Sequence, residues 1–363
     1  MVLIRILTFF ALLAAGNAAG AQPSSHWLEE ARRDIGAPGL AFAVWREGRI
    51  VEGAAGERAL GSGVAVLPRD PFHIGSITKP VTATLAARLV EQGLLSWTDT
   101  IGERLAGIDI HPAYLGLTLA HLLSHRAGIA PDAHPQETAQ LARIRSLGER
   151  RARAAALILA LPPAAAPGRS YLYSNYSYLV AAVMMEQATG RSWEQLVRED
   201  VLAPLGLTSA GFGPPGSASL VDAPWGHIAP GTLVSGPVSP NSPLADNPPF
   251  RAPAGGLHMS MRDLALFGAA HLLGEAGEEV SFLSTGTWRF LHARHPGAQA
   301  TGWALGEGGS LHHDGSNLRW FALLRVIPEE RLVIAIAANA ANDLDRSRRA
   351  FWRLSEQLRR TMR

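Results

Sequence analysis

The chain has 363 residues, of which 47% are hydrophobic and 18% charged, so its composition is that of a folded protein and excludes general disorder. The formal net charge is only +2, from 33 basic and 31 acidic residues. The pI of 9.3 is high because few groups titrate between histidine and tyrosine, so it does not indicate a nucleic-acid-binding surface. The absence of cysteine excludes disulfides, thiol catalysis and cysteine-ligated metal centres.

Residues 1–21 have the pattern of a secretory signal peptide. Arg5 precedes an apolar run at 6–15, and Ala-Gly-Ala at 19–21 fits a cleavage site with small residues. The run is shorter than the roughly 20 apolar residues that cross a bilayer. We therefore expect an exported protein, periplasmic or secreted, with no stable membrane insertion and with 22–363 as a single domain. An uncleaved N-terminal anchor is the alternative.

The predicted elements at the two chain ends favour one antiparallel sheet flanked by helices. In chain order these elements are a helix at 25–35, strands at 40–45 and 50–55, strands at 319–327 and 331–338, and a helix at 343–362. The middle of the chain is then an insertion that returns to the sheet. The sequence predicts an α+β fold, an α/β sandwich whose sheet is built from both chain ends.

The inserted middle is predicted to be mostly helical. Apolar periodicity and capping signals indicate helices at 77–92, 117–125, about 136–160, 177–188, 192–203 and 260–273. The stretch 211–256 is rich in Gly, Pro and Ser and shows little periodicity. Because Trp225, Leu233 and Phe250 lie within it, we expect a packed, substrate-facing loop region rather than a linker.

A Ser-x-x-Lys motif at the start of the first long inserted helix carries the candidate nucleophile. Ser76 and Lys79 are three residues apart, so their side chains can touch on one helix face. A serine hydroxyl needs a base to become a nucleophile, and a buried lysine can serve when it is neutral. Of the 33 basic residues, 32 are Arg and Lys79 alone is Lys. Since an arginine cannot give up its proton, this exception indicates a functional lysine.

Two further clusters contain groups suited to proton transfer and ligand binding. Four of the five tyrosines lie within 171–178, where Tyr173 is a candidate proton carrier and Asn175 a hydrogen-bonding residue. An aromatic patch covering the edge of the core is the alternative interpretation. His313 is followed two residues later by Gly315, directly before the strand predicted at 319–327, and this pattern suits a strand edge that approaches a ligand closely.

In order along the chain, the motifs Phe-His-Ile-Gly-Ser-Ile-Thr-Lys at 72–79, Tyr-Ser-Asn at 173–175 and His-Asp-Gly at 313–315 resemble those of the serine β-lactamase and penicillin-binding-protein superfamily. The likeness is greatest to its class C β-lactamase, D-alanyl-D-alanine carboxypeptidase and esterase branch. Supporting stretches lie at 122–129, 204–207 and 254–257. The resemblance spans nearly the whole chain after residue 21.

The resemblance implies a role for each candidate site residue. Ser76 is the acylated nucleophile, Lys79 its partner and Tyr173 the general base, although the assignment of the base between Tyr173 and Lys79 stays open. Asn175 contacts the acyl side chain. In the third motif, His313 and Gly315 bind substrate, and the backbone N–H groups of Ser76 and Ser316 form the oxyanion hole. The resemblance implies no cofactor and no metal.

One departure from the family pattern bears on the substrate. β-Lactamases of this type carry Lys where this chain has His313, so a titratable imidazole replaces a fixed ammonium. Carboxypeptidases, esterases and D-amino-acid amidases of the family accept His at this position. We therefore expect hydrolysis of small esters or D-amino-acid amides and peptides, with a class C type β-lactamase or a non-catalytic penicillin-binding sensor as alternatives. Arg319 is a candidate substitute anchor for a carboxylate, whereas Trp320 is expected to pack.

Two other enzyme classes fit the sequence less well. A conventional Ser-His-Asp hydrolase of the α/β type lacks its marker here, because the chain contains no Gly-x-Ser-x-Gly motif. A zinc enzyme is suggested by His121 and His125 at helical spacing and by the adjacent His312 and His313. No Glu follows His121, however, so the His-Glu-x-x-His pattern is missing. The expected partner is a small-molecule or peptide substrate, and the oligomeric state stays open.

Overall fold

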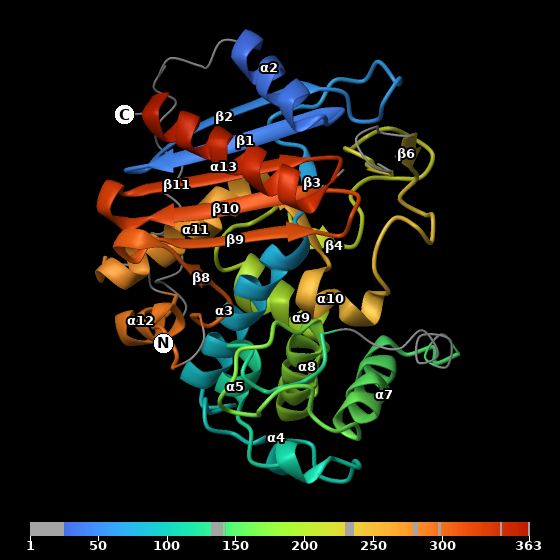
Figure 1. Cartoon of the computed structure of the whole chain (residues 1–363), viewed down its shortest axis with the longest axis vertical. Helices are drawn as coiled ribbons and strands as arrows, with labels where there is room; N and C mark the ends of the chain where they lie inside the picture. The colour runs from blue at the N-terminus through green and yellow to red at the C-terminus, as the bar shows by residue number, and fades with distance from the viewer. Residues whose placement is uncertain are drawn as a thin grey trace, which may run out of the picture.

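The computed structural model describes residues 25–131, 141, 143–228, 236–278, 282–296, 299–341 and 343–361. The predicted signal peptide at 1–21 lies outside these residues. Figure 1 shows the chain with a sheet in the upper half of the molecule and a mainly helical region in the lower half. The first and last helices of the described residues, α2 (Ser25–Ile35) and α13 (Leu344–Thr361), lie next to each other beside the sheet. The two ends of the described chain therefore meet in one layer.

Six antiparallel strands form the main sheet. Their order across the sheet is β2 (Arg49–Gly56), β1 (Gly39–Arg46), β11 (Leu332–Ala338), β10 (Phe321–Ile327), β9 (Leu311–Ser316) and β8 (Ala304–Leu305). The first strands of the chain thus pair with the last, with Leu40 opposite Ala338. This arrangement confirms the predicted α+β fold with a sheet built from both chain ends.

Two smaller sheets come from the segment between β2 and β8. One has the order β3 (Pro71–His73), β7 (Leu257–Ser260) and β4 (Gly211–Phe212), and the other pairs β5 (Gly226–Ile228) with β6 (Gly236–Val238). The same segment contains the short 3₁₀ turns η1 (Gly75–Ile77), η2 (Pro112–Tyr114) and η4 (Pro249–Arg251) and the π-helical turn η3 (Arg198–Leu202). Two more 3₁₀ turns, η5 (Glu307–Gly309) and η6 (Pro328–Glu330), flank β9 and β10.

The helices of the described chain fall into a terminal pair and an inserted set. The terminal pair is α2 (Ser25–Ile35) and α13 (Leu344–Thr361). The inserted set is α3 (Thr78–Glu91), α4 (Ile101–Arg104), α5 (Leu119–Leu123), α7 (Leu147–Leu159), α8 (Asn175–Thr189), α9 (Trp193–Val197), α10 (Ala252–Gly255), α11 (Met261–Ala276) and α12 (Thr285–His292).

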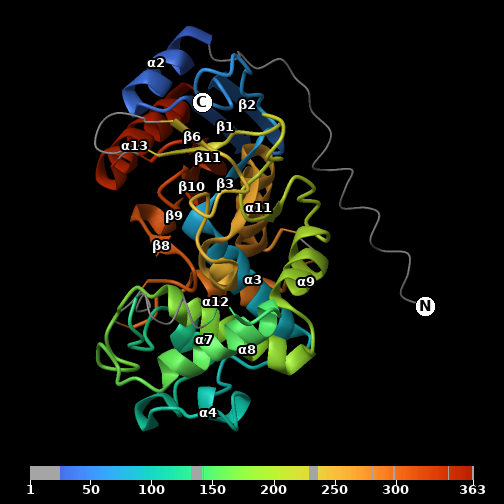
Figure 2. The ribbon, with the colours of Figure 1, turned by 90° about the vertical axis from the view of Figure 1, so that its right-hand side faces the viewer.

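Helices cover both faces of the main sheet, as Figure 2 shows with α2 and α13 on one side and α11 on the other. The alternation of side chains along a strand supplies both layers. Leu40, Phe42 and Val44 of β1 pack with residues of α2 and α13, whereas Ala41 and Ala43 face the core shared with α11. All five are buried, because a sheet covered on both faces reads as a continuous apolar run rather than as alternation.

Helix α3 lies in the interior of the helical half, where it contacts α8, α9, α10 and α12. Its Val81, Leu85 and Leu89 are fully buried, and so are the polar Thr82 and Thr84, whose hydroxyls bond to carbonyl oxygens. The residues just before and within its first turn are therefore held in a closely packed environment. This packing positions the Ser-x-x-Lys motif.

Several predicted elements differ from the observed ones at their ends. The strand expected at 319–327 begins at Phe321, because the side-chain oxygen of Asn317 accepts hydrogen bonds from the backbone N–H groups of Arg319 and Trp320. The third motif forms a strand of its own, β9, rather than a lead-in to β10. The helix expected at 136–160 is interrupted: Leu141 is helical, residues 143–146 are not, and α7 begins at Leu147, where Ser146 caps the first turn. Residues 136–140 and 142 lie outside the described chain.

The region 211–256 is mostly irregular, as predicted, but is organised by the short elements β4, β5, β6, η4 and α10. Phe250 is buried and Trp225 is half-buried, which confirms that these two residues pack. Leu233 lies outside the described residues. Helix α12 is an element that the sequence analysis missed.

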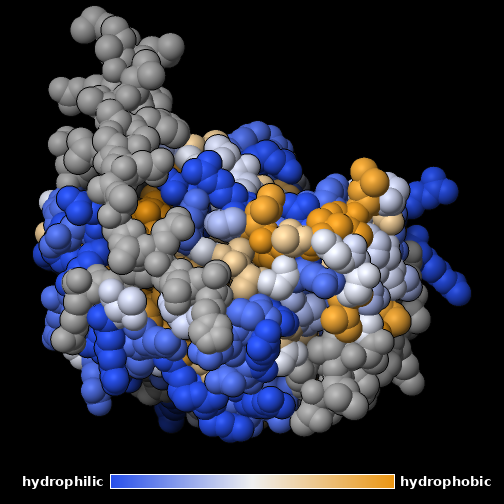
Figure 3. Space-filling model, turned by 90° about the horizontal axis from the view of Figure 1, so that it is seen from above, coloured by the Kyte–Doolittle hydropathy of each residue, from blue (hydrophilic) through white to orange (hydrophobic). Residues whose placement is uncertain are grey.

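The upper face of the molecule is mainly hydrophilic, with separate apolar areas between polar ones (Figure 3). Within the described parts of the chain, the structure contains no helix with the length and hydropathy that a membrane span requires.

A buried pair of histidines makes stability depend on pH. Thr84 Oγ1 donates to the carbonyl of Pro80, so it accepts from His271 Nε2 at 3.1 Å, and His271 Nδ1 accepts from His292 Nε2 at 2.8 Å. Burial, assisted by the charge of His292, lowers the pKa of His271 well below its usual value. The folded protein therefore holds His271 neutral, whereas the unfolded chain takes up a proton below about pH 6.5.

We predict that the free energy of unfolding falls as the pH is lowered from 7 to 5, because the depressed pKa of His271 belongs to the folded state only. His271→Gln should make this dependence shallower by up to about 1.4 kcal/mol per pH unit, the value for one proton. Urea unfolding at several pH values measures it, with His111→Gln at a half-exposed histidine as the control. An unchanged slope in His271→Gln would contradict the prediction.

Candidate active site

The Ser-x-x-Lys motif lies at the junction of β3, η1 and α3. Ser76 is in the 3₁₀ turn η1, and Lys79 and Pro80 are in the first turn of α3. Proline is tolerated there because the first N–H groups of a helix have no partner within the helix. This junction places the Ser76 hydroxyl one turn from the Lys79 amine, with Nζ and Oγ 3.1 Å apart.

Lys79 is fully buried and has three oxygen partners. Its Nζ lies 2.7 Å from the carbonyl oxygen of Ala254, 2.8 Å from Oδ1 of Asn175 and 3.1 Å from Oγ of Ser76. The first two oxygens can only accept, whereas the serine hydroxyl can donate as well. A neutral amine therefore fits, with two N–H bonds to Asn175 and Ala254 and its lone pair toward Ser76, and an ammonium fits with three donated bonds.

Tyr173 completes the contacts of the serine hydroxyl. Its OH donates to Ser76 Oγ at 2.8 Å, and Lys79 Nζ lies 4.7 Å from the centre of its ring. Ser174 caps α8 by accepting from the N–H of Ser177, and Asn175 is the first residue of that helix. The Tyr-Ser-Asn motif thus sets a tyrosine before the helix, where it reaches Ser76 and Lys79, and an asparagine within the helix, where it reaches Lys79.

The ring of His125 packs against the ring of Tyr173. Its ring centroid lies 4.5 Å from that of Tyr173, and its Nδ1 accepts the N–H of Ser174 at 3.1 Å. Burial, followed by the charges of Lys79 and His313, lowers the pKa of His125 well below its usual value. A neutral ring is the form that this Nδ1 contact requires. His125 therefore orients Tyr173 and Ser174, the two residues that precede α8.

The third motif lies against the nucleophile through backbone contacts. A Cβ added to Gly315 would fall 2.0 Å from the carbonyl oxygen of Ile74 and 2.6 Å from the N atom of Ser76. A Cβ added to Gly75, whose φ is +51°, would fall 2.3 Å from the N atom of Ser316. Only glycine permits this approach at both positions. The backbone N atoms of Ser76 and Ser316 therefore both lie where the two backbones meet.

His313 lies beside the same group, on β9. Its Nδ1 donates to the carbonyl oxygen of Asp314 at 2.6 Å, because a carbonyl can only accept. Loss of solvent around the ring and the charge of Lys79 lower the pKa of His313 to about 4. At neutral pH the third motif therefore presents a neutral imidazole rather than a cation.

The structure thus brings all seven predicted site residues into one region: Ser76, Lys79, Tyr173, Asn175, His313, Gly315 and Ser316. Sequence analysis missed the role of the Ala254 carbonyl as a partner of Lys79, although it noted the stretch 254–257. Gly255, next in that stretch, lies beside the backbone of Gly75 and Ser76. It lines a cavity of about 190 Å³, whose wall also includes Phe212 and Asn247.

Arg319 does not occupy a strand position, which corrects the sequence analysis. It lies in the turn before β10, where its Nε donates to the carbonyl of Leu244 at 2.9 Å and its Nη1 to the carbonyl of Leu318 at 3.0 Å. Trp320 is fully buried and its Nε1 donates to the carbonyl of Pro224, so the expectation that it packs is confirmed.

The histidines considered as metal ligands have separate partners. His121 accepts the N–H of Thr118 at the start of α5, whereas His125 contacts Tyr173 and Ser174. His312 packs its ring against Trp352 of α13. Among the described residues, no three His, Cys, Asp or Glu side chains are grouped as metal ligands would be.

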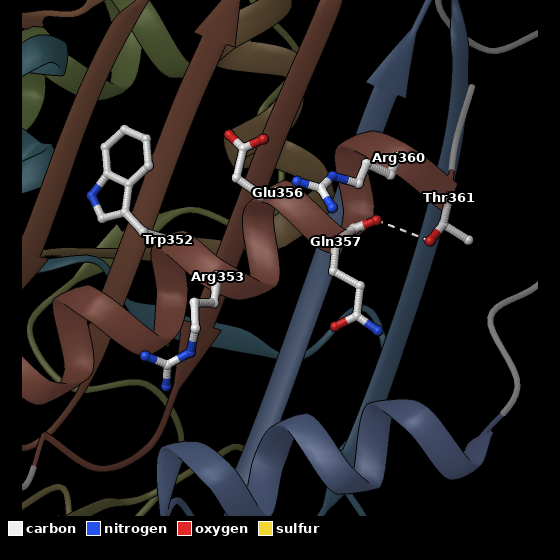
Figure 4. Close-up of a pocket in the computed structure, with 6 residues that line it drawn as sticks. All are labelled: Trp352, Arg353, Glu356, Gln357, Arg360 and Thr361. Carbon is white, nitrogen blue, oxygen red and sulfur yellow. Dashed lines mark hydrogen bonds between the residues drawn. The ribbon is translucent and has the colours of Figure 1, made fainter.

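A hollow of about 700 Å³ on the outer side of α13 is a separate feature (Figure 4). It is lined by Trp352, Arg353, Glu356, Gln357, Arg360 and Thr361. The hydroxyl of Thr361 donates to the carbonyl of Gln357, and the Glu356 carboxylate accepts from Arg325 and Arg359.

Comparison with known proteins identifies the family of the chain. The Beta-lactamase family profile matches residues 25–358. Penicillin-binding protein 4 of Amycolatopsis lactamdurans is 30% identical over 337 residues, covering 87% of this chain and 85% of that protein.

Two solved structures have the same fold. The structure of SurE with D-Leu superposes with a TM-score of 0.72 and 26% identity, covering 92% of this chain and 74% of that one. A D-stereospecific amidohydrolase from Streptomyces sp. superposes with a TM-score of 0.68 and 22% identity, covering 90% and 96%. The family match, at residues 25–358, covers almost all of the described residues. The chain therefore belongs to the Beta-lactamase family of serine hydrolases.

Proposed function

We propose that the chain hydrolyses small esters or D-amino-acid amides and peptides through an acyl-enzyme on Ser76. The observation that carries the proposal is the position of the Ser76 hydroxyl, which contacts both Lys79 Nζ at 3.1 Å and Tyr173 OH at 2.8 Å. A serine between two groups that can exchange a proton has the base that nucleophilic attack requires. No cofactor is needed for this chemistry.

In the proposed reaction, Ser76 Oγ attacks the substrate carbonyl carbon while its proton passes to the Lys79 and Tyr173 pair. The backbone N–H groups of Ser76 and Ser316 stabilise the negative charge that develops on the carbonyl oxygen. The same pair then protonates the leaving oxygen or nitrogen, and the acyl-enzyme forms. Water, deprotonated by the pair, attacks the ester of Ser76 and releases the acid.

Three observations support esters and D-amino-acid amides over β-lactams. His313 is neutral at ordinary pH because its pKa is lowered to about 4, so the third motif offers no fixed cation to a carboxylate. Arg319 is engaged with two backbone carbonyls rather than directed as an anchor. Among the structural relatives are a D-stereospecific amidohydrolase and a protein solved with D-Leu.

Export of the protein is also part of the proposal, and it rests on the sequence pattern of residues 1–21 alone.

The acyl-enzyme is tested at Ser76 and Lys79. Incubation with a fluorophosphonate should add one label to Ser76, seen by intact-mass and peptide-mass measurement, and Ser76→Ala should reduce p-nitrophenyl ester hydrolysis to near background. Lys79→Arg keeps the charge but removes any neutral amine, so acylation should fall by at least about 100-fold while the protein stays folded. Tyr173→Phe should slow the same step. A fully active Ser76→Ala or Lys79→Arg would overturn the mechanism.

The backbone contact between β9 and η1 is tested at Gly315. Gly315→Ala would place a methyl group 2.6 Å from the Ser76 N atom and push the two backbones apart, so kcat should fall by about two to three orders of magnitude, as when an oxyanion donor is lost. Gly148→Ala is the matched control, because a Cβ there meets no atom within 4 Å. Steady-state kinetics together with thermal unfolding separate loss of activity from loss of fold. Near-normal kcat in a folded Gly315→Ala would contradict the oxyanion assignment.

Substrate class is tested by comparing kcat/KM for short-chain p-nitrophenyl esters, D-alanyl amides and nitrocefin. Nitrocefin turnover far above ester turnover would overturn the substrate assignment and favour a β-lactamase. His313→Lys should introduce a cation into the third motif. The preference for carboxylate-bearing over neutral substrates should then rise by about tenfold, which corresponds to roughly 1.4 kcal/mol. His312→Lys is the control, because neighbouring residues of a strand point to opposite faces.

A further inference from the structure

A buried histidine lies directly behind the turn that carries the nucleophile. His73, the last residue of β3, is fully buried, and its Nδ1 lies 3.2 Å from the N atom of Gly75. Its Nε2 lies 3.0 Å from Oδ2 of Asp246. Since the Gly75 N–H can only donate, His73 Nδ1 carries a lone pair, and the ring proton is on Nε2, where it is donated to Asp246.

The other oxygen of Asp246 is bound to the residue that follows Ser316. Asn317 Nδ2 donates to Asp246 Oδ1 at 2.9 Å and to the carbonyl oxygen of Ala245 at 3.1 Å. The amide oxygen of Asn317 accepts from the N–H groups of Arg319 and Trp320. These contacts use both donors and the acceptor of the amide, so its orientation is fixed.

Packing holds this group rigid. Trp320 stacks on the His73 ring, with centroids 5.6 Å apart and planes at 27°, and both side chains are fully buried. Burial would raise the pKa of Asp246, but attraction to His73 and hydrogen bonds from His73, Asn317 and the Asn247 N–H lower it below the usual value. A single carboxylate, ionised at neutral pH, is therefore connected to both backbones that meet at the active site.

We propose that Asp246 is a positioning residue of the oxyanion hole, which it holds in register through His73 on the Gly75 side and through Asn317 on the Ser316 side. This inference rests on the proposed function, in which the N–H groups of Ser76 and Ser316 bind the oxyanion. Such donors act only when they are held in place before the reaction. Gly75 has no side chain to restrain its left-handed conformation, so an external anchor is required.

The test is Asp246→Asn, which keeps the shape but has only one acceptor oxygen for His73 and Asn317. We expect kcat for p-nitrophenyl acetate to fall 10- to 100-fold with KM within about threefold, because an oxyanion contact acts in the transition state. For the matched thionoester, whose sulfur is a weak hydrogen-bond acceptor, kcat should change little. The ratio of oxoester to thionoester kcat should therefore fall at least tenfold.

Asp263→Asn is the control for a general loss of a buried carboxylate. Asp263, in the first turn of α11, accepts hydrogen bonds from the N–H and the hydroxyl of Ser209, not from His73 or Asn317. Asp263→Asn should lower thermal stability and leave the ratio of oxoester to thionoester kcat unchanged. An equal fall of the ratio in Asp263→Asn would mean that the effect is structural, and the assignment of Asp246 would be wrong.

Asn317→Ala breaks the other half of the connection and carries the test if Asp246→Asn does not fold. Where both fold, the double variant should lower the ratio little further than Asp246→Asn alone, since both changes interrupt one chain of contacts. Fluorophosphonate labelling separates the two hypotheses. If Ser76 is labelled and the ratio stays at the wild-type value in Asp246→Asn or Asn317→Ala, the positioning role is wrong while the proposed function stands. If Ser76 is not labelled in the wild type, the proposed function itself fails.

Discussion

The close approach of strand β9 to the turn η1 is the constraint on which the rest of the site depends. Two backbones meet there without side chains between them, Gly315 against Ser76 and Gly75 against Ser316. The contact joins the C-terminal part of the sheet to the start of the central helix α3, two segments that are more than 200 residues apart in the sequence. Because backbone N–H groups cannot be moved by a change of rotamer, the positions of these segments decide the geometry of the proposed oxyanion hole.

Burial of Lys79 is the second condition, and it follows from the position of α3. A lysine at the protein interior is unfavourable unless its nitrogen is hydrogen-bonded, and here three oxygens from three different elements surround it. One comes from η1, one from the first residue of α8 and one from α10. The helical half of the molecule and the irregular segment before β7 are thus both needed to hold one amine in place.

Much of this could be predicted from the sequence. The strands at both chain ends are long apolar runs, and the single Lys among 32 Arg stands three residues after a Ser at a helix start, so these features are local. The ends of elements were less certain, because side chains decide them: Asn317 replaces two ladder hydrogen bonds and delays β10 until Phe321. Asp246 could not be found, since it lies in an irregular stretch and its partners are distant in sequence.

The sequence by itself determined the candidate reacting groups, because Ser76, Lys79, Tyr173 and Asn175 belong to short motifs whose spacing within a helix or at a helix start fixes their relative positions within each motif. Only the tertiary structure decided their environment. The neutral state of His313, the backbone contact of Gly315 with Ser76 and the connection of Asp246 to both sides of the site depend on burial and on elements brought together by the fold. Burial and long-range approach are properties of packed elements, and no local pattern of residues encodes them.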